Sequence, residues 1–144
     1  MQDLEPLSEA AVNCGFRIHQ ELGPCLLESV YEALMASSLA RRGLFVERQK
    51  VIPIEFDGMS FAEGFRADLV VERQLLIEIK SIDRLAPVHG KQLLTYLRLT
   101  KQPVGLLMNF GAATFKEGVK RAVNGHTNFA SSRLRVNQIP SAQP

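Results

Sequence analysis

The sequence predicts an α/β domain in which helices flank a mixed sheet, built from a three-strand antiparallel meander and one further strand. Three observations lead to this prediction. Apolar residues recur at helical spacing up to Gly43, the pattern changes to that of β-strands up to Ser81, and a helix, a strand and a helix follow. With 144 residues, the chain can bury a single core. We expect one domain over residues 1–125 and a poorly ordered polar tail over residues 126–144.

Two helices are predicted before the first strand. The first covers residues 7–21, with Ser8 as its cap. The pair Gly23-Pro24 then ends this helix and can begin the next, because proline suits a first helical turn. The second helix runs to about Arg42 on an apolar stripe, and Gly43 is placed to stop it.

The next three segments should form the antiparallel meander. Residues 44–58 alternate as a strand does and end in the turn signal DGMS. Residues 61–71 form the second strand, which runs up to Glu72-Arg73-Gln74, and residues 75–81 form the third.

The remaining elements are predicted to be a helix, a strand and a helix. Pro87 opens the helix PVHGKQLLTYLRLT, whose apolar side includes three leucines. VGLLMNF is continuously apolar, which is typical of a strand buried on both faces. A final helix is expected over about Ala113–Val123.

Composition argues against several classes of protein. The longest apolar stretches fall well short of the ~20 residues of a transmembrane helix. The acidic start MQDLEPLSEA lacks the basic and apolar regions of a signal peptide. Cys14 and Cys25 have neither CxxC spacing nor clustered partners, so a disulfide framework or zinc site is not expected. We therefore expect a cytoplasmic protein without membrane contact.

Charge is distributed unevenly along the chain. Up to Ile79 there are seven Lys or Arg against thirteen Asp or Glu, whereas from Lys80 onward ten Lys or Arg face only Asp83 and Glu117. Such asymmetry points to a polyanionic partner. The alternative is that folding intermixes the two halves and leaves no patch, and the charge counts do not separate these possibilities.

Charged residues interrupt the second and third strands of the meander. A three-residue loop over Glu72–Gln74 places Asp68 opposite Glu78, whereas a slip of one residue would undo the match. Glu78 and Lys80 share a face whatever the loop length, because side chains alternate along a strand. The other face is wholly apolar and carries Ala67, Leu69, Val71, Leu75, Ile77 and Ile79.

Two interpretations of this charged face are open. Facing carboxylates repel unless a cation lies between them, and two carboxylates with room for waters and a substrate phosphate suit Mg²⁺ or Mn²⁺. Lys80 could then orient a water or stabilise developing negative charge. The alternative is a salt-bridged solvent face in which Lys80 and Arg66 neutralise the acids. Charge spacing by itself favours this second interpretation.

Asp68 followed ten residues later by Glu78-Ile79-Lys80, on adjacent strands, resembles the PD-(D/E)XK nuclease signature. More specifically, the chain resembles the small single-domain bacterial GxxExxY proteins, which are grouped with that superfamily. The resemblance covers roughly Phe16 to Val123. It is carried by HQELGPCLLESVYE, FRADLVVERQLLIEIKS, HGKQLLTYLRLT, VGLLMNFG and KEGVKR.

Two positions depart from the patterns. Cys25 stands where the name of the GxxExxY family has its glycine, whereas Glu28 and Tyr31 are retained. A glycine there would ease entry into the helix, so Cys25 is expected to alter the local backbone rather than the chemistry. Ala67 replaces the nominal proline before Asp68.

The resemblance implies a set of site residues. Asp68 and Glu78 would be metal ligands, the backbone carbonyl of Ile79 would supply a further oxygen, and Lys80 would be the catalytic lysine. Glu28 matches the acidic residue that many members place beside the metal. The alternative for Glu28 is that an acid in a first helical turn is favoured by the helix dipole. The implied cofactor is Mg²⁺ or Mn²⁺.

A second group of candidates lies on the helix that Pro87 opens. His89, Gln92 and Tyr96 are spaced by three and four residues, so they can line one helix face. The Gln-x-x-x-Tyr pair resembles a motif that helps some superfamily nucleases to hold substrate or the active site. Alternatively, Tyr96 packs in the core and Gln92 is simply exposed. His19 and His126 are expected to be structural or surface residues, and Tyr31 is expected to be a core residue rather than a catalytic one.

Together these features predict a divalent-metal-dependent nuclease that hydrolyses phosphodiester bonds in nucleic acid, with DNA as the expected substrate. The main alternative is a non-catalytic nucleic-acid- or protein-binding module that retains the nuclease fold. A third, weaker alternative is a self-associating scaffold, in which apolar edge strands such as VIPIEF pair between chains and form a homodimer.

Overall fold

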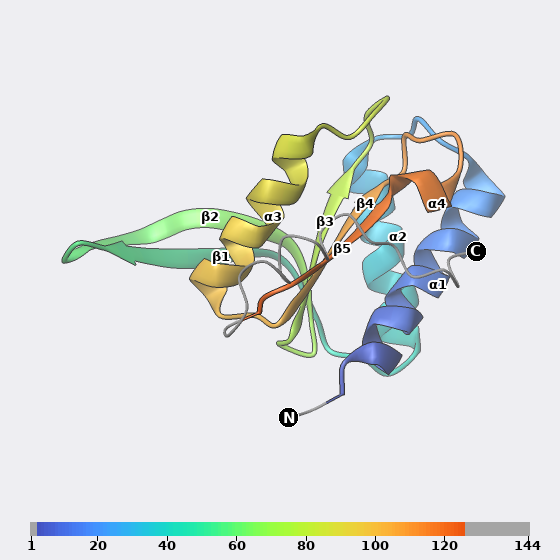
Figure 1. The fold of residues 1–144 in the computed structure, drawn as a ribbon. Coiled ribbons are helices and arrows are strands. Elements are labelled where there is room, and N and C mark those ends of the chain that lie inside the picture. Colours follow the sequence, from blue (N-terminus) through green and yellow to red (C-terminus); the bar gives the residue numbers. More distant parts are fainter. Residues whose placement is uncertain (1–2, 126–144) are drawn as a thin grey trace.

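The computed structural model describes residues 3–125. They form a five-stranded sheet flanked by helices, with α1 and α2 on one face and α3 on the other (Figure 1). The helices are α1 (Glu5–Leu22), α2 (Glu28–Arg41), α3 (Pro87–Thr100) and α4 (Phe115–Gly118). The strands are β1 (Val46–Phe56), β2 (Met59–Val71), β3 (Leu75–Lys80), β4 (Val104–Asn109) and β5 (Val119–Val123).

The sheet is mixed, as the sequence predicts. Its strands lie in the order β1-β2-β3-β4-β5. The first three form the antiparallel meander, β4 runs parallel to β3, and β5 is antiparallel to β4. The parallel step places α3 across the sheet between β3 and β4, since a parallel neighbour requires a crossover connection. The predicted α/β class is therefore confirmed.

Two hydrophobic clusters fill the spaces on either side of the sheet. The larger one joins α1 and α2 to the face that carries Leu69, Ile77 and Ile79. The smaller one joins α3 to the opposite face, which carries Val70 and Leu76. The alternating side chains of β2 and β3 thus serve two cores, and both faces of the hairpin are covered near its loop.

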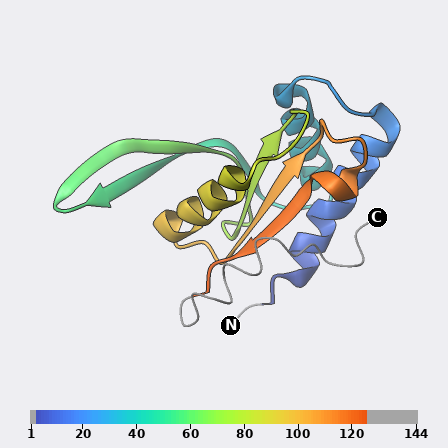
Figure 2. The same ribbon diagram turned by 45° about the horizontal axis from the view of Figure 1, so that its top comes forward.

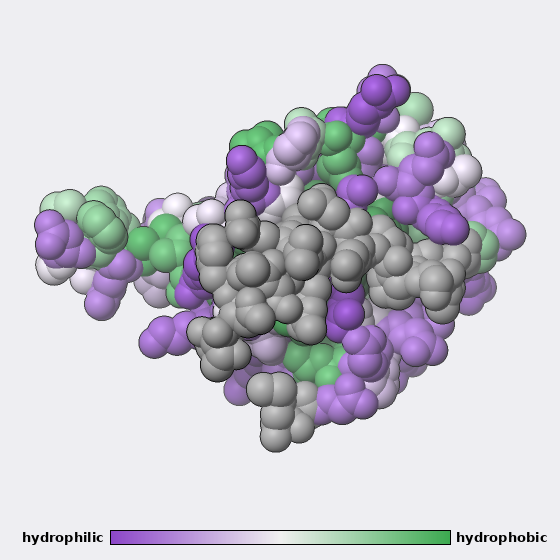
Figure 3. All heavy atoms as spheres, in the orientation of Figure 1, coloured by the Kyte–Doolittle hydropathy of each residue, from purple (hydrophilic) through white to green (hydrophobic). Residues whose placement is uncertain are grey.

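The far ends of β1 and β2 leave the body of the protein as a two-stranded arm (Figures 1 and 2). Its turn is the predicted DGMS segment, where Asp57 and Gly58 have φ angles of 51° and 77°. Two successive residues with positive φ match the tight turns that join antiparallel strands. Phe56, Met59 and Phe61 are exposed near the tip, so the arm shows apolar as well as hydrophilic surface (Figure 3).

The predicted final helix over 113–123 is wrong. The structure has a single helical turn, α4, followed by β5, which pairs with the free edge of β4. A Cβ atom on Gly118 would lie 2.1 Å from the carbonyl oxygen of Asn109, so the chain passes too close to β4 there for a side chain. Burial of Val119 and Ala122 against the sheet then overrides the helical preference of the charged residues beside them.

Two predicted helix starts are also corrected. Ser8 does not cap α1, because this helix begins at Glu5 with Pro6 in its first turn and Ser8 is buried inside it. The second helix starts at Glu28 rather than at Gly23-Pro24. The predicted polar tail over 126–144 lies outside the described residues. Within them, no helix combines the length and hydropathy needed to cross a membrane.

Candidate active site

The β2–β3 hairpin has the predicted three-residue loop. Val71 pairs with Leu75 and Leu69 with Ile77. One step further, at Asp68 and Glu78, the hydrogen bonds between the two backbones end, and backbone N–H groups donate to side-chain carboxylates instead. The Asp68 N–H donates to Oε2 of Glu78 at 3.1 Å, and the Ile79 N–H donates to Oδ2 of Asp68 at 2.7 Å. The two carboxylates therefore occupy the gap in which β2 separates from β3.

The carbonyl of Ile79 faces the same gap. The N–H and C=O of one residue in a strand point to the same neighbouring strand. Since the Ile79 N–H donates to Asp68, the Ile79 carbonyl also points toward β2. The carbonyl of Lys80 points the other way and accepts a 2.8 Å hydrogen bond from the N–H of Phe110. Two carboxylates and one backbone carbonyl thus converge where the hairpin opens.

The carboxylate pair is electrostatically unfavourable. Glu78 is only 7 % exposed. Its burial, and next the charge of Asp68, raise the pKa of Glu78 to about 8. Burial also raises the pKa of Asp68, although the hydrogen bond from the Ile79 N–H opposes this. Burial and the neighbouring charge thus both favour the protonated form of Glu78.

Lys80 lies close enough to act on both acids. Its positive charge lowers the pKa of Asp68 and of Glu78. None of the ion pairs found between residues 3 and 125 joins Lys80 to either carboxylate. Glu78 is buried rather than solvent-facing. This arrangement does not fit the salt-bridged solvent face that charge spacing favours.

The oxygen atoms at this site suit Mg²⁺ or Mn²⁺ better than a metal ion that takes all of its ligands from protein side chains. Among the described residues, no group of three or more His, Cys, Asp and Glu side chains is arranged to hold a metal ion. Mg²⁺ commonly uses one or two carboxylates and keeps several waters for exchange with substrate phosphate oxygens. Asp68, Glu78 and the Ile79 carbonyl provide such an all-oxygen set, and the mutual repulsion of the acids favours a cation between them.

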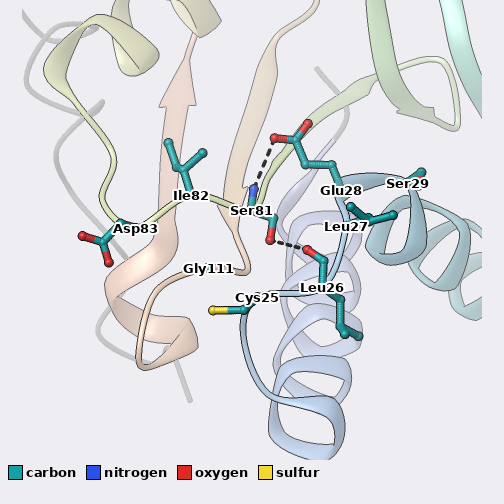
Figure 4. A pocket seen from close by; sticks show the side chains of 9 residues that line it. All are labelled: Cys25, Leu26, Leu27, Glu28, Ser29, Ser81, Ile82, Asp83 and Gly111. Carbon is teal, nitrogen blue, oxygen red and sulfur yellow. Dashed lines mark hydrogen bonds between the residues drawn. The ribbon is translucent and has the colours of Figure 1, made fainter.

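Glu28 lies at the end of β3 rather than within the carboxylate pair. Its Oε2 accepts a 3.3 Å hydrogen bond from the N–H of Ser81, the residue after Lys80. The two residues line an open pocket of about 620 Å³ in which Ser81 also donates to the carbonyl of Leu26 (Figure 4). Neither Asp68 nor Glu78 lines this pocket. The hydrogen bond from Ser81 to Glu28 thus links the start of α2 to the end of β3, next to Lys80.

The predicted candidates on α3 lie in different environments. The Tyr96 ring stacks on Phe65 with ring centroids 3.9 Å apart. The pKa of Tyr96 is raised by burial and then by the charges of Glu78 and Asp68, so its hydroxyl lies within their field. Gln92 is exposed one turn earlier. His89 accepts a 2.8 Å hydrogen bond from the N–H of Ala86 through Nδ1, so it caps the start of α3.

Tyr31 and His19 are structural, as expected. Tyr31 is fully buried and stacks on Phe110 at 4.4 Å. Its hydroxyl donates to the carbonyl of Gly23 at 2.6 Å and accepts from the N–H of Leu26 at 3.1 Å. His19 is buried with Nε2 at 2.9 Å from the carbonyl of Ala112. His126 lies outside the described residues.

Sequence reasoning missed two residues beside Asp68. Gln49 on β1 donates through Nε2 to Oδ1 of Asp68 at 3.2 Å and also to Oε1 of Glu32. Glu32 on α2 is 6 % exposed and accepts from Arg48 at 3.1 Å. The register of β1 against β2 puts Gln49 across from Asp68, but this register shifts between Ile52 and Ile54, so the turn alone does not reveal the contact.

Comparison with known proteins identifies the superfamily of the chain. A family model described as the PD-(D/E)XK nuclease superfamily matches residues 5–122. The chain belongs to the PD-(D/E)XK nuclease superfamily. No curated protein and no solved structure gave a significant match. The superfamily's nucleases generally depend on a divalent metal. Asp68 and Glu78-Ile79-Lys80, which carry the resemblance in the sequence, lie within the matched residues.

Proposed function

We propose that this protein is a divalent-metal-dependent nuclease that hydrolyses phosphodiester bonds in nucleic acid, with DNA as its substrate. The observation that carries the proposal is the pair of Asp68 and Glu78, held together in a gap of the sheet with the pKa of Glu78 raised to about 8. Burying two carboxylates side by side costs stability unless a cation binds them. Lys80, one residue beyond the Ile79 carbonyl, adds the motif's third side chain.

Each residue has a chemical role in this proposal. Asp68, Glu78 and the Ile79 carbonyl would hold Mg²⁺ or Mn²⁺. The ion, when bound, supplies Lewis-acid polarisation of the phosphate and stabilisation of the leaving oxygen. The Lys80 ammonium donates hydrogen bonds that orient the attacking water and stabilise negative charge on the phosphate oxygens. Gln92 and Tyr96 offer further donors to the substrate from α3.

The basic half of the chain fits a polyanionic substrate. Exposed cationic residues follow the site on α3 and just after it: Lys91, Arg98 and Lys101. We expect these residues to contribute phosphate contacts. Because phosphate contacts release bound counterions, we expect nucleic-acid binding to weaken steeply as salt concentration rises.

Within the superfamily, we assign the chain to the GxxExxY proteins. The loop before α2 gives this pattern a physical meaning. Cys25, at the glycine position, has a φ angle of 79°, in the region that glycine adopts without strain. Glu28 binds the backbone of Ser81, and the Tyr31 hydroxyl holds the loop at Gly23 and Leu26. The three named positions therefore support one turn at the edge of the site.

A cleavage assay tests the nuclease proposal. The parent protein, Asp68→Ala, Lys80→Ala and the exposed control Lys116→Ala are incubated with single- and double-stranded DNA and RNA in Mg²⁺, Mn²⁺ or EDTA. We expect metal-dependent cleavage by the parent and control, reduced by about 10²-fold or more in the two site variants. Equal cleavage by all four proteins would identify a contaminant or a different site and would refute the proposal.

A further inference from the structure

We propose that Gln49 is a positioning residue that fixes the carboxylate of Asp68, and that Glu32 holds Gln49 in place. The inference rests on the proposed metal-dependent function, because it concerns a predicted ligand of the same site. It assigns a role to two residues outside the D…ExK motif, from β1 and α2. The geometry of one amide group carries the argument.

The amide of Gln49 faces two carboxylates. Its Nε2 donates to Oδ1 of Asp68 at 3.2 Å and to Oε1 of Glu32. An amide NH₂ has two hydrogens, so both bonds can form together. A flipped amide would turn its oxygen toward two carboxylates, which offer it no donor when ionised. The chemistry therefore fixes which end of Gln49 faces Asp68.

With this contact, both oxygens of Asp68 are held. Oδ2 accepts from the Ile79 N–H at 2.7 Å, and Oδ1 accepts from Gln49. Two hydrogen bonds from different strands fix the plane of the carboxylate as well as its position. The lone pairs that remain on Asp68 then have a defined direction before any cation arrives. Such partners of metal ligands commonly change metal affinity by 10- to 100-fold when removed.

The backbone of Gln49 is strained at this point. Its φ angle is 48°, in the left-handed region that residues with a Cβ rarely adopt. On either side, Arg48 pairs with Leu69 and Lys50 pairs with Ala67, so the strain lies in a single residue within the β1–β2 ladder. A conformation of this kind is unfavourable for a residue with a side chain, and it occurs here at the residue whose side chain reaches Asp68.

Glu32 anchors the other end of the contact. It is buried on α2 and also accepts from Arg48 at 3.1 Å, so a second contact holds its carboxylate beside Gln49. Its charge also raises the pKa of Asp68 and Glu78, so it adds negative potential to the site. Glu32 thus combines a fixed acceptor for Gln49 with a longer-range attraction for a cation.

The test measures Mn²⁺ binding without nucleic acid. Gln49→Met keeps a similar side-chain length but removes the amide, and Lys50→Met is the control, because Lys50 neighbours Gln49 and binds the remote Glu47 at 2.7 Å. By titration calorimetry, we expect Gln49→Met to weaken Mn²⁺ affinity about tenfold or more. We expect Lys50→Met to stay within about threefold of the parent. The Mn²⁺ electron paramagnetic resonance spectrum should change for Gln49→Met alone.

A second variant separates positioning from folding. Gln49→Gly relieves the positive φ angle, so its melting temperature in EDTA should stay close to that of the parent while Mn²⁺ affinity still falls. The positioning role would be overturned if Gln49→Met or Gln49→Gly bound Mn²⁺ as tightly as the parent. It would also be overturned if Gln49→Met and Lys50→Met lost affinity equally. Neither result would affect the proposed nuclease function. If the parent protein bound Mn²⁺ but cleaved no nucleic acid, the proposed nuclease function would be refuted, and the Mn²⁺ titrations would still test the role of Gln49. If the parent protein bound no Mn²⁺, both the proposed metal-dependent function and the positioning role of Gln49 would be refuted.

Discussion

Both faces of the β2–β3 hairpin are covered by apolar clusters, but one of them also buries a carboxyl group beside a second one. Leu69 and Ile77 on one face are fully buried against α1 and α2, where removal of apolar surface from water stabilises the fold. On the other face Glu78 is 7 % exposed and lies beside a second carboxylate. Burial there removes water from a charge and costs free energy.

This difference indicates that Asp68 and Glu78, unlike the apolar residues around them, are not placed there to stabilise the fold. A domain of this size has a net stability of about 5–15 kcal/mol, so a buried like-charge pair uses a noticeable part of it. Strained or repulsive arrangements that the rest of a structure maintains are found mainly at functional sites.

The largest effect on stability is expected on the apolar face. Ile77→Ala should lower the free energy of unfolding by about 3 kcal/mol, because it leaves a cavity in the larger core. Urea unfolding measures this change. Leu99→Ala is the control: Leu99 is 39 % exposed, and its loss should cost less than about 0.5 kcal/mol. Similar small losses for both variants would show that the apolar face does not dominate stability.

On the charged face, a substitution should instead stabilise the protein. Glu78→Gln keeps the shape of the side chain and removes its charge, so we expect the metal-free variant to gain roughly 1–2 kcal/mol at pH 8. Mn²⁺ binding should be lost in the same variant. Urea unfolding in EDTA and calorimetry with Mn²⁺ measure the two effects. A Glu78→Gln variant less stable than the parent at pH 8 would contradict the idea that this face is costly.

The pH dependence of this difference has a definite sign. The pKa of Glu78 is about 8 in the folded protein against an ordinary value of 4.5. Between these values the folded state keeps a proton that the unfolded state has lost, so the stability of the parent falls as pH rises through this window. The advantage of Glu78→Gln should therefore be small near pH 4.5, grow up to pH 8 and then level off. If the stability difference between Glu78→Gln and the parent did not change with pH, the ionisation of Glu78 would not be its cause.

The sequence predicted those parts of the molecule that depend on local pattern. The three-residue loop set the register of Val71 against Leu75, and that register brought Asp68 beside Glu78. By contrast, β5 forms because β4 offers a free edge, which the residues over 119–123 do not reveal by themselves. Gln49 was missed for a similar reason: its contact with Asp68 depends on a positive φ angle and on the position of α2.

The smallest predicted effect concerns the loop that leads into α2. The φ angle of Cys25 is 79°, and a side chain in this region costs about 1 kcal/mol relative to glycine. Cys25→Gly should therefore raise the free energy of unfolding by roughly 0.5–1 kcal/mol, even though glycine increases the entropy of the unfolded chain. The neighbouring Leu26, which is also exposed, is not among the residues with positive φ.

Leu26→Gly is thus the matched control, and it should lower stability. Thermal unfolding of the two variants beside the parent distinguishes backbone strain from a general effect of glycine in this loop. Stabilisation by Cys25→Gly alone would mean that the backbone at position 25 needs a residue that adopts positive φ without strain. Destabilisation by Cys25→Gly would show instead that the thiol contributes contacts that outweigh the strain.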